Sequence, residues 1–161
     1  MGFFKSAKGS IMSENFLLLE DVGQFNKGLA IEVALHDDHL EMKAPFMKKT
    51  PVSLKYEQIT DVFYGLQTEI VQKNKSPIGR AVAGGLLFGG AGAIVGAISG
   101  TGKKETKVSK FYFIISYTSA AGEEKLLQFE DTRLFKGRKL ATQLKDLCGI
   151  STASQAEITE L

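Results

Sequence analysis

AVAGGLLFGGAGAIVGAI, residues 81–98, is the stretch that most distinguishes this chain of 161 residues. It contains no charged residue, and seven glycines lie between Gly84 and Gly100. The run is about as long as the shortest transmembrane helices. In water, however, each glycine would weaken a helix by roughly 1 kcal/mol relative to alanine. Because small residues let two helices approach closely, the composition favours a bilayer or a tight helical pair.

Small residues recur at every fourth position of this run and form two stripes. Residues four apart lie on the same face of a helix. The pattern is therefore a glycine zipper, and it predicts a surface for self-association. The first stripe contains Ala81, Gly85, Gly89, Ala93 and Ala97, and the second contains Gly92, Gly96 and Gly100.

Both flanks of the zipper are basic, whereas a helix that crosses once usually has its basic residues on the cytoplasmic side. The two ends are therefore expected on one side, with a reversal near residues 89–92. Each arm would span roughly 15 Å as a helix, against a hydrocarbon core of roughly 30 Å. Two interpretations stay open: a hairpin that dips into one leaflet, and a hairpin packed in water on its own domain or a neighbouring subunit. The flanking cations, expected to contact an anionic surface, are Lys73, Lys75, Arg80, Lys103, Lys104 and Lys107.

The overall composition argues against a nucleic-acid partner and against a disulfide-bonded fold. Twenty basic residues stand against 18 acidic ones, so nucleic acid is not an expected partner. The single cysteine, Cys148, rules out an intrachain disulfide and fits a reducing cytoplasm. We interpret it as a buried structural thiol. Residues 1–24 form an N-terminal segment without a secretory signal, and residues 150–161 a polar tail.

The rest of the sequence reads as strands followed by one helix. Residues 108–118 are apolar on both faces and are expected at the centre of a sheet, and Gly65 is the expected bulge. The helix is predicted from a cap at Asp131 or Thr132 to Gly149. Residues 15–22 are ambiguous between a strand and a helical turn. The strands are predicted over residues 29–35, 40–44, 52–56, 59–72, 108–118 and 125–130.

At this point the chain resembles bacterial and phage proteins in which a PH-like (GRAM-like) domain is interrupted by a glycine-zipper insert. The resemblance implies an α+β, mainly β, fold over residues 25–149. The expected architecture is a strongly bent antiparallel β-barrel or sandwich, with a C-terminal capping helix and a Gly-rich helical hairpin inserted at residues 77–102. The resemblance rests on four stretches of sequence: HDDHLEMK (36–43), SLKYEQITDV (53–62), EIVQKNKSPIGRAVAGGLLFGGAGAIVGAISG (69–100) and KFYFIISYTSAAGEEKLLQF (110–129).

Candidate catalytic groups are few. The four side chains of His36-Asp37-Asp38-His39 suggest a metal site, but a strand turn should make them diverge, and aspartates are common in turns. With two histidines and one cysteine, no triad has plausible members. No Gly-Lys-Ser/Thr closes the glycine run into a phosphate loop. We therefore expect no enzyme activity, no metal and no cofactor.

A second candidate for lipid contact is the loop between Pro45 and Pro51. It combines apolar and cationic groups, which suits an interfacial contact. The alternative is a solvated loop with its phenylalanine turned inward. The turn at Asp37 and Asp38 is acidic, a departure from the basic hairpin with which many PH-like domains bind inositol phosphates. The residues of this secondary loop are Phe46, Met47, Lys48 and Lys49.

These observations favour a non-enzymatic module that associates with the cytoplasmic face of the membrane and self-assembles through its zipper hairpin. The expected partners are further copies of the chain and an anionic membrane surface, and the expected location is peripheral to the inner face of the cell membrane. The alternative is a soluble phage or host-defence factor that binds an unidentified protein and uses the insert for subunit contacts. A barrel interior that binds a small ligand is the third hypothesis, although small barrels are usually filled by side chains.

Overall fold

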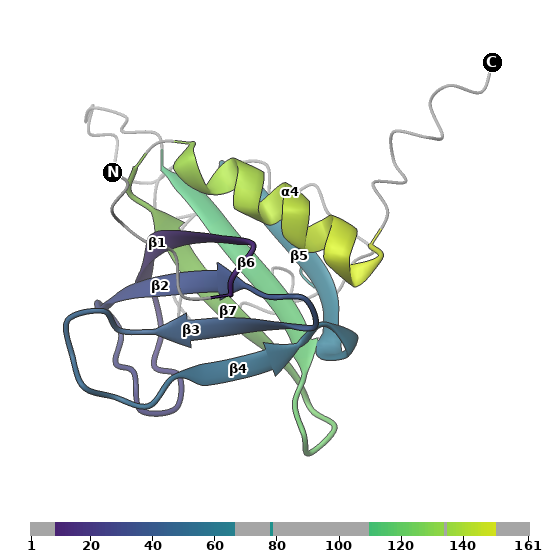
Figure 1. The fold of residues 1–161 in the computed structure, drawn as a ribbon, viewed down its shortest axis with the longest axis horizontal. Coiled ribbons are helices and arrows are strands. Elements are labelled where there is room, and N and C mark those ends of the chain that lie inside the picture. The colour runs from purple at the N-terminus through teal and green to yellow at the C-terminus, as the bar shows by residue number, and fades with distance from the viewer. Residues whose placement is uncertain (1–8, 67–77, 79–109, 134, 151–161) are drawn as a thin grey trace, which may run out of the picture.

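The computed structural model describes residues 9–66, 78, 110–133 and 135–150. In this part of the chain, seven strands form one antiparallel sheet in the order β4-β3-β2-β1-β7-β6-β5, followed by one C-terminal helix (Figure 1). A short 3-10 helix, η1, joins β4 to β5. The bounds are β1 Met12–Leu18, β2 Ala30–Leu35, β3 His39–Lys43, β4 Val52–Lys55, η1 Tyr56–Gln58, β5 Ile59–Leu66, β6 Phe111–Thr118, β7 Glu124–Asp131 and α4 Lys136–Cys148.

Strand β1 joins the two halves of the sheet. It pairs with β2 along its length, and its last residues pair with β7, Leu17 opposite Glu130 and Leu18 opposite Phe129. Strands β4 and β5 are the two edges of the sheet, so the barrel expected from the sequence is not closed. The mainly antiparallel β fold with a C-terminal helix is confirmed. The inserted helical hairpin lies outside the described residues, of which only Ile78 belongs to the insert.

The core is built on aromatic side chains of the inner sheet face. The ring of Phe16 lies 4.9 Å from that of Phe113 and 5.6 Å from that of Phe129, and all three are at most 2% exposed. Helix α4 crosses this face and packs against β1, β5 and η1 (Figure 1). The contact is close at Gly137, where a Cβ would stand 2.5 Å from a carbon of the Phe16 ring.

The start of α4 differs from the predicted cap. The helix begins at Lys136, and the preceding Phe135 adopts a left-handed conformation with φ 70°. Asp131 is the last residue of β7, yet its Oδ2 accepts a hydrogen bond of 2.7 Å from the Gly137 backbone N–H. The Asp131 carboxylate therefore accepts a hydrogen bond from a backbone N–H of the first turn although it lies outside the helix. This explains why the helix start predicted from the sequence is too early. The predicted end is confirmed, because Gly149 is left-handed at φ 75°.

Three further expectations are settled by the strands. Residues 15–18 of the ambiguous segment lie in β1, so the sheet begins upstream of residue 25. Strand β6 lies between β5 and β7 with both faces buried, as its apolar pattern predicted. The bulge at Gly65 is wrong: Gly65 pairs regularly with Tyr112, and the register shifts between Ile59 and Asp61 instead. There the hydroxyl of Thr60 donates to the carbonyl of Ser116 at 3.2 Å.

Candidate functional site

The loop between β3 and β4 presents apolar side chains to solvent. Phe46 is 88% exposed and Met47 is 43% exposed, so the phenylalanine is not turned inward. The Met47 N–H donates to the carbonyl of Ala44 at 3.1 Å and closes a turn. Exposed apolar side chains at the tip of a turn cost solvation free energy without contributing to the core. Phe46 and Met47 therefore form a small exposed apolar patch at the tip of this turn.

The neighbouring β1–β2 loop braces this tip. The Lys49 ammonium donates to the Gln24 carbonyl at 2.8 Å, and the Gln24 side-chain amide donates back to the Thr50 carbonyl. Lys49 thus serves the structure of the loop, while Lys48 is exposed beside Phe46 and Met47. A phenyl ring, a thioether and a free ammonium on one braced turn match the chemistry of a headgroup boundary.

A second feature is the outer face of β5, β6 and β7. Three side chains of β5 and β6 that point away from the core, Phe63, Tyr112 and Ile114, form a separate buried cluster with Ile78. Leu19 and Leu126 pack against it. Ile78 comes from the insert, and it and Ile114 are completely buried. The sequence signal for this surface is the continuous apolar run of β6, which we had taken only as evidence for a central strand.

The edge of this outer face is acidic. Gln128 donates from its side-chain amide to Glu20 Oε1 at 3.0 Å, and both residues line an open depression with Asp21, Tyr117 and Lys125. Burial raises the pKa of Glu20 to about 7, and the neighbouring charge of Asp21 adds to the effect. The depression is lined by the carboxyl groups of Glu20, Asp21 and Glu124 and by the ammonium group of Lys125, so its lining carries no excess of positive charge for an anionic headgroup.

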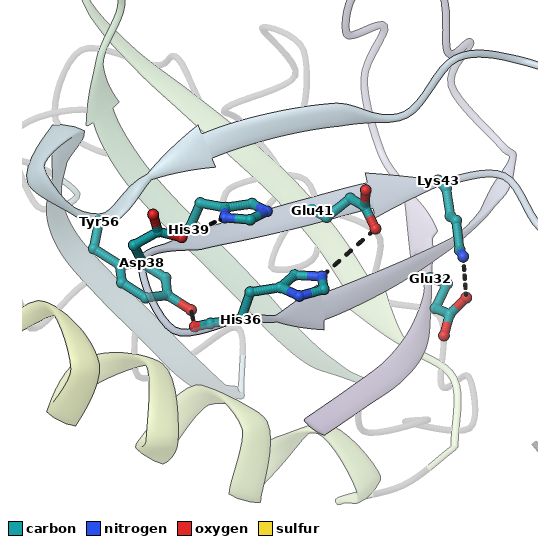
Figure 2. Close-up of polar contacts among 7 residues, drawn as sticks. All are labelled: Glu32, His36, Asp38, His39, Glu41, Lys43 and Tyr56. Carbon is teal, nitrogen blue, oxygen red and sulfur yellow. Dashed lines mark hydrogen bonds and ion pairs between the residues drawn. The ribbon is translucent and has the colours of Figure 1, made fainter. Parts of the chain in front are cut away.

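The β2–β3 hairpin carries the two histidines on its outer face (Figure 2). Their rings stack with centroids 4.6 Å apart, so the expectation that these side chains diverge is wrong. The hairpin causes this, because the backbone N–H of His36 donates to the carbonyl of His39 and places both residues side by side. His39 Nδ1 lies 2.7 Å from Asp38 Oδ1, and this hydrogen bond lowers the pKa of the Asp38 carboxyl.

Polar contacts tie this hairpin to its surroundings. His36 Nε2 lies 3.6 Å from Glu41 Oε1, and the hydroxyl of Tyr56 donates to the carbonyl of His36 at 2.6 Å (Figure 2). Within the described part of the chain, no group of three or more histidine, cysteine or acidic side chains is arranged to hold a metal ion. The Tyr56 hydroxyl and the Asp38 carboxylate thus make hydrogen bonds at the hairpin, whereas His36 Nε2 is buried without a hydrogen-bond partner among the described residues.

The remaining predicted site residues lie outside the described residues. These are both zipper stripes and all the flanking cations: Ala81, Gly85, Gly89, Gly92, Ala93, Gly96, Ala97, Gly100, Lys73, Lys75, Arg80, Lys103, Lys104 and Lys107. Among the residues that are described, no helix has the length and hydropathy needed to span a bilayer.

The bent antiparallel sheet with one C-terminal helix across its inner face is consistent with the PH-like class. The sequence model of the family described as glycine zipper containing PH domain matches residues 21–129 of this chain. The chain therefore belongs to that family. A comparison with curated proteins gives no significant match. Domains of the PH-like class are typically non-catalytic, and the family places the chain among interaction modules.

Proposed function

We propose that this protein is a non-enzymatic PH-like module that associates with the cytoplasmic face of the membrane and self-assembles through its glycine-zipper insert. The observation that carries the membrane part is the braced β3–β4 loop, which holds Phe46 at 88% exposure beside Met47 and Lys48. The zipper sequence supplies the larger apolar surface, and its stripes support packing between copies.

The β3–β4 loop and the insert would contribute unequally to the free energy of membrane binding. Each cation close to an anionic surface contributes about 1 kcal/mol, so six cations around the zipper outweigh the one free lysine of the loop. Burial of a Phe side chain contributes roughly 1.5–3 kcal/mol when complete. The loop thus acts as a second contact that orients the domain, while the insert supplies most of the attachment.

Vesicle flotation tests the loop directly. Phe46→Ser combined with Met47→Ser should lower the bound fraction on vesicles of phosphatidylglycerol and phosphatidylcholine by about tenfold in partition constant. The matched control is Ile11→Ser, because Ile11 is 47% exposed and lies outside the loop. An equal loss in the control and the loop variant would refute the loop as a lipid contact.

The soluble interaction factor is the second candidate function. The observation in its favour is that Ile78 of the insert is fully buried in the outer-face cluster, which is a protein contact. Under this alternative, neither the full chain nor the loop variant would float, and the chain would stay in the supernatant without detergent.

A further inference from the structure

The outer face of β5, β6 and β7 is built like a buried surface. An antiparallel sheet with one face in water normally carries polar residues on that face. Here the outward residues Phe63, Tyr112 and Ile114 are all less than 9% exposed. The strand pairing aligns them, since Phe63 lies opposite Ile114 and Gly65 opposite Tyr112. Three large side chains gathered on one face need a cover to stay out of water.

Polar groups on the same face are buried as well. Ser116 and Gln128 are at most 1% exposed, and Asp61 is 7% exposed. Ser116 accepts a hydrogen bond of 2.9 Å from the Thr60 hydroxyl, and Gln128 binds Glu20. Ser116 and Gln128 are thus paired within the sheet and its immediate neighbours, as buried polar groups normally are. Asp61 Oδ1 accepts a hydrogen bond of 2.9 Å from the Val62 backbone N–H, while its Oδ2 is buried without a hydrogen-bond partner among the described residues.

Ile78 identifies the covering segment. It is fully buried, it belongs to the cluster of Phe63, Tyr112 and Ile114, and it lies in the insert between β5 and β6. Complete burial of an isoleucine side chain contributes roughly 1.5–3 kcal/mol toward holding its segment on the sheet. In sequence, Ile78 comes shortly before Ala81, the first residue of the zipper.

We infer that the outer face of β5–β6–β7 is a docking surface for the chain's own insert, with Ile78 as the anchoring residue. Ile78 would then fix the insert to the sheet at a point shortly before Ala81, the first zipper residue in the sequence. This inference does not depend on membrane association, because the contact lies within one chain.

Limited digestion of the full chain with trypsin tests the anchor. Lys75 and Arg80 flank Ile78, whereas Lys48 is exposed in the distant β3–β4 loop and serves as a reference site whose cleavage does not depend on the outer face. Urea unfolding of each variant measures global stability separately. Ile78→Ala and Ile114→Ala should each accelerate cleavage after Lys75 and Arg80 by about tenfold relative to cleavage after Lys48, because each opens the same contact. The double variant should be no faster than the faster single variant.

Strand β6 provides a matched control. Ile115 is the next residue after Ile114, has the same chemistry and is also fully buried, but it points into the core on the inner face. Ile115→Ala should lower global stability without a selective effect at Lys75 and Arg80. If Ile114→Ala does not fold, Ile114→Val replaces it. This smaller change should accelerate cleavage after Lys75 and Arg80 by about threefold.

The outcomes separate clearly. Selective acceleration in the Ile78 and Ile114 variants, unchanged when the protein is diluted, supports docking within one chain. Equal effects of Ile114→Ala and Ile115→Ala on these sites would overturn the inference. So would unchanged cleavage in Ile78→Ala and Ile114→Val, or an acceleration that depends on protein concentration, which would assign the contact to a second copy.

Discussion

Substitution of Gly137 by alanine tests the packing of α4 on the sheet. In an exposed helix this change would stabilise the protein by about 1 kcal/mol, because glycine has a low helix propensity. Gly137 is buried, however, and a Cβ there would stand 2.5 and 2.7 Å from two carbons of the Phe16 ring. It would also stand 3.0 Å from Asp131 Oδ2, which holds the first turn of the helix. The steric contacts of the added methyl group therefore oppose the stabilisation expected from the higher helix propensity of alanine.

The contact distances set the size of the effect. Carbon atoms pack at about 3.5–4.0 Å, so the ring or the helix must move by about 1 Å. Phe16 has little room, since its ring lies 4.9 Å from that of Phe113 and 5.6 Å from that of Phe129. Overpacking of a dense core costs about 1–3 kcal/mol. After the gain in helix propensity, we expect Gly137→Ala to lower the free energy of unfolding by about 1–2 kcal/mol.

Urea unfolding followed by far-UV circular dichroism measures this change. Thr142→Ala, at an exposed position of α4, is the control and should be neutral or slightly stabilising. In a Phe16→Leu background, Gly137→Ala should cost less, because the smaller side chain leaves room for the methyl group. A Gly137→Ala variant as stable as the parent protein, or more stable, would refute the close contact.

Three other predictions concern the helix cap, the acidic edge and the zipper. Tyr64→Phe removes the hydroxyl that donates to Asp131 Oδ2 at 2.5 Å, and should lower the free energy of unfolding by about 1–2 kcal/mol in urea melts. For Glu20, burial raises the pKa from 4.5 to about 7, so the folded state holds the proton more tightly than the unfolded state. The stability that this provides is complete below pH 4.5 and is lost as the pH rises through 7. Glu20→Gln should therefore raise stability at pH 8 relative to the parent by about 1 kcal/mol, after allowance for solvent screening, and should have little effect near pH 4.5. A stability difference that is the same at both pH values would contradict this assignment. Gly89→Leu should reduce the sedimentation coefficient of the assembled protein far more than Leu87→Ala does, because a large side chain blocks close helix packing. Equal sedimentation of the two variants would exclude the zipper as the packing surface.

The sequence predicted the sheet well because its strands carry strong local patterns. Strand β6 is apolar at nearly every position, and the structure buries both of its faces between β5 and β7. Residues 15–22 are ambiguous in sequence because apolar residues fill positions 16–19 without alternation: Phe16 and Leu18 belong to the inner core, whereas Leu19 packs against the outer-face cluster. That packing involves segments distant in sequence, so no local pattern could indicate it.

The features that sequence reasoning missed depend on the same kind of long-range contact. No local pattern marks Gly137 as intolerant of a side chain, and only the packing of Phe16 shows why a Cβ is not accommodated there. Asp131 was recognised as a cap, but its bond to Tyr64 and its distance from the helix start follow from tertiary structure. The outer-face cluster joins Ile78 to strands on both sides of the insert, which no pattern within a single element reveals.

Vesicle flotation of two proteins tests the proposed membrane function most directly. One is the full chain, and the other has residues 81–100 replaced by a short polar turn, so that Ile78 and the flanking cations are retained in both. We predict that the full chain floats with anionic vesicles and binds neutral vesicles more weakly, while the replaced variant remains at the bottom of the gradient. Equal flotation of the two proteins, or no flotation of the full chain, would contradict the assignment of the zipper as a membrane-binding element.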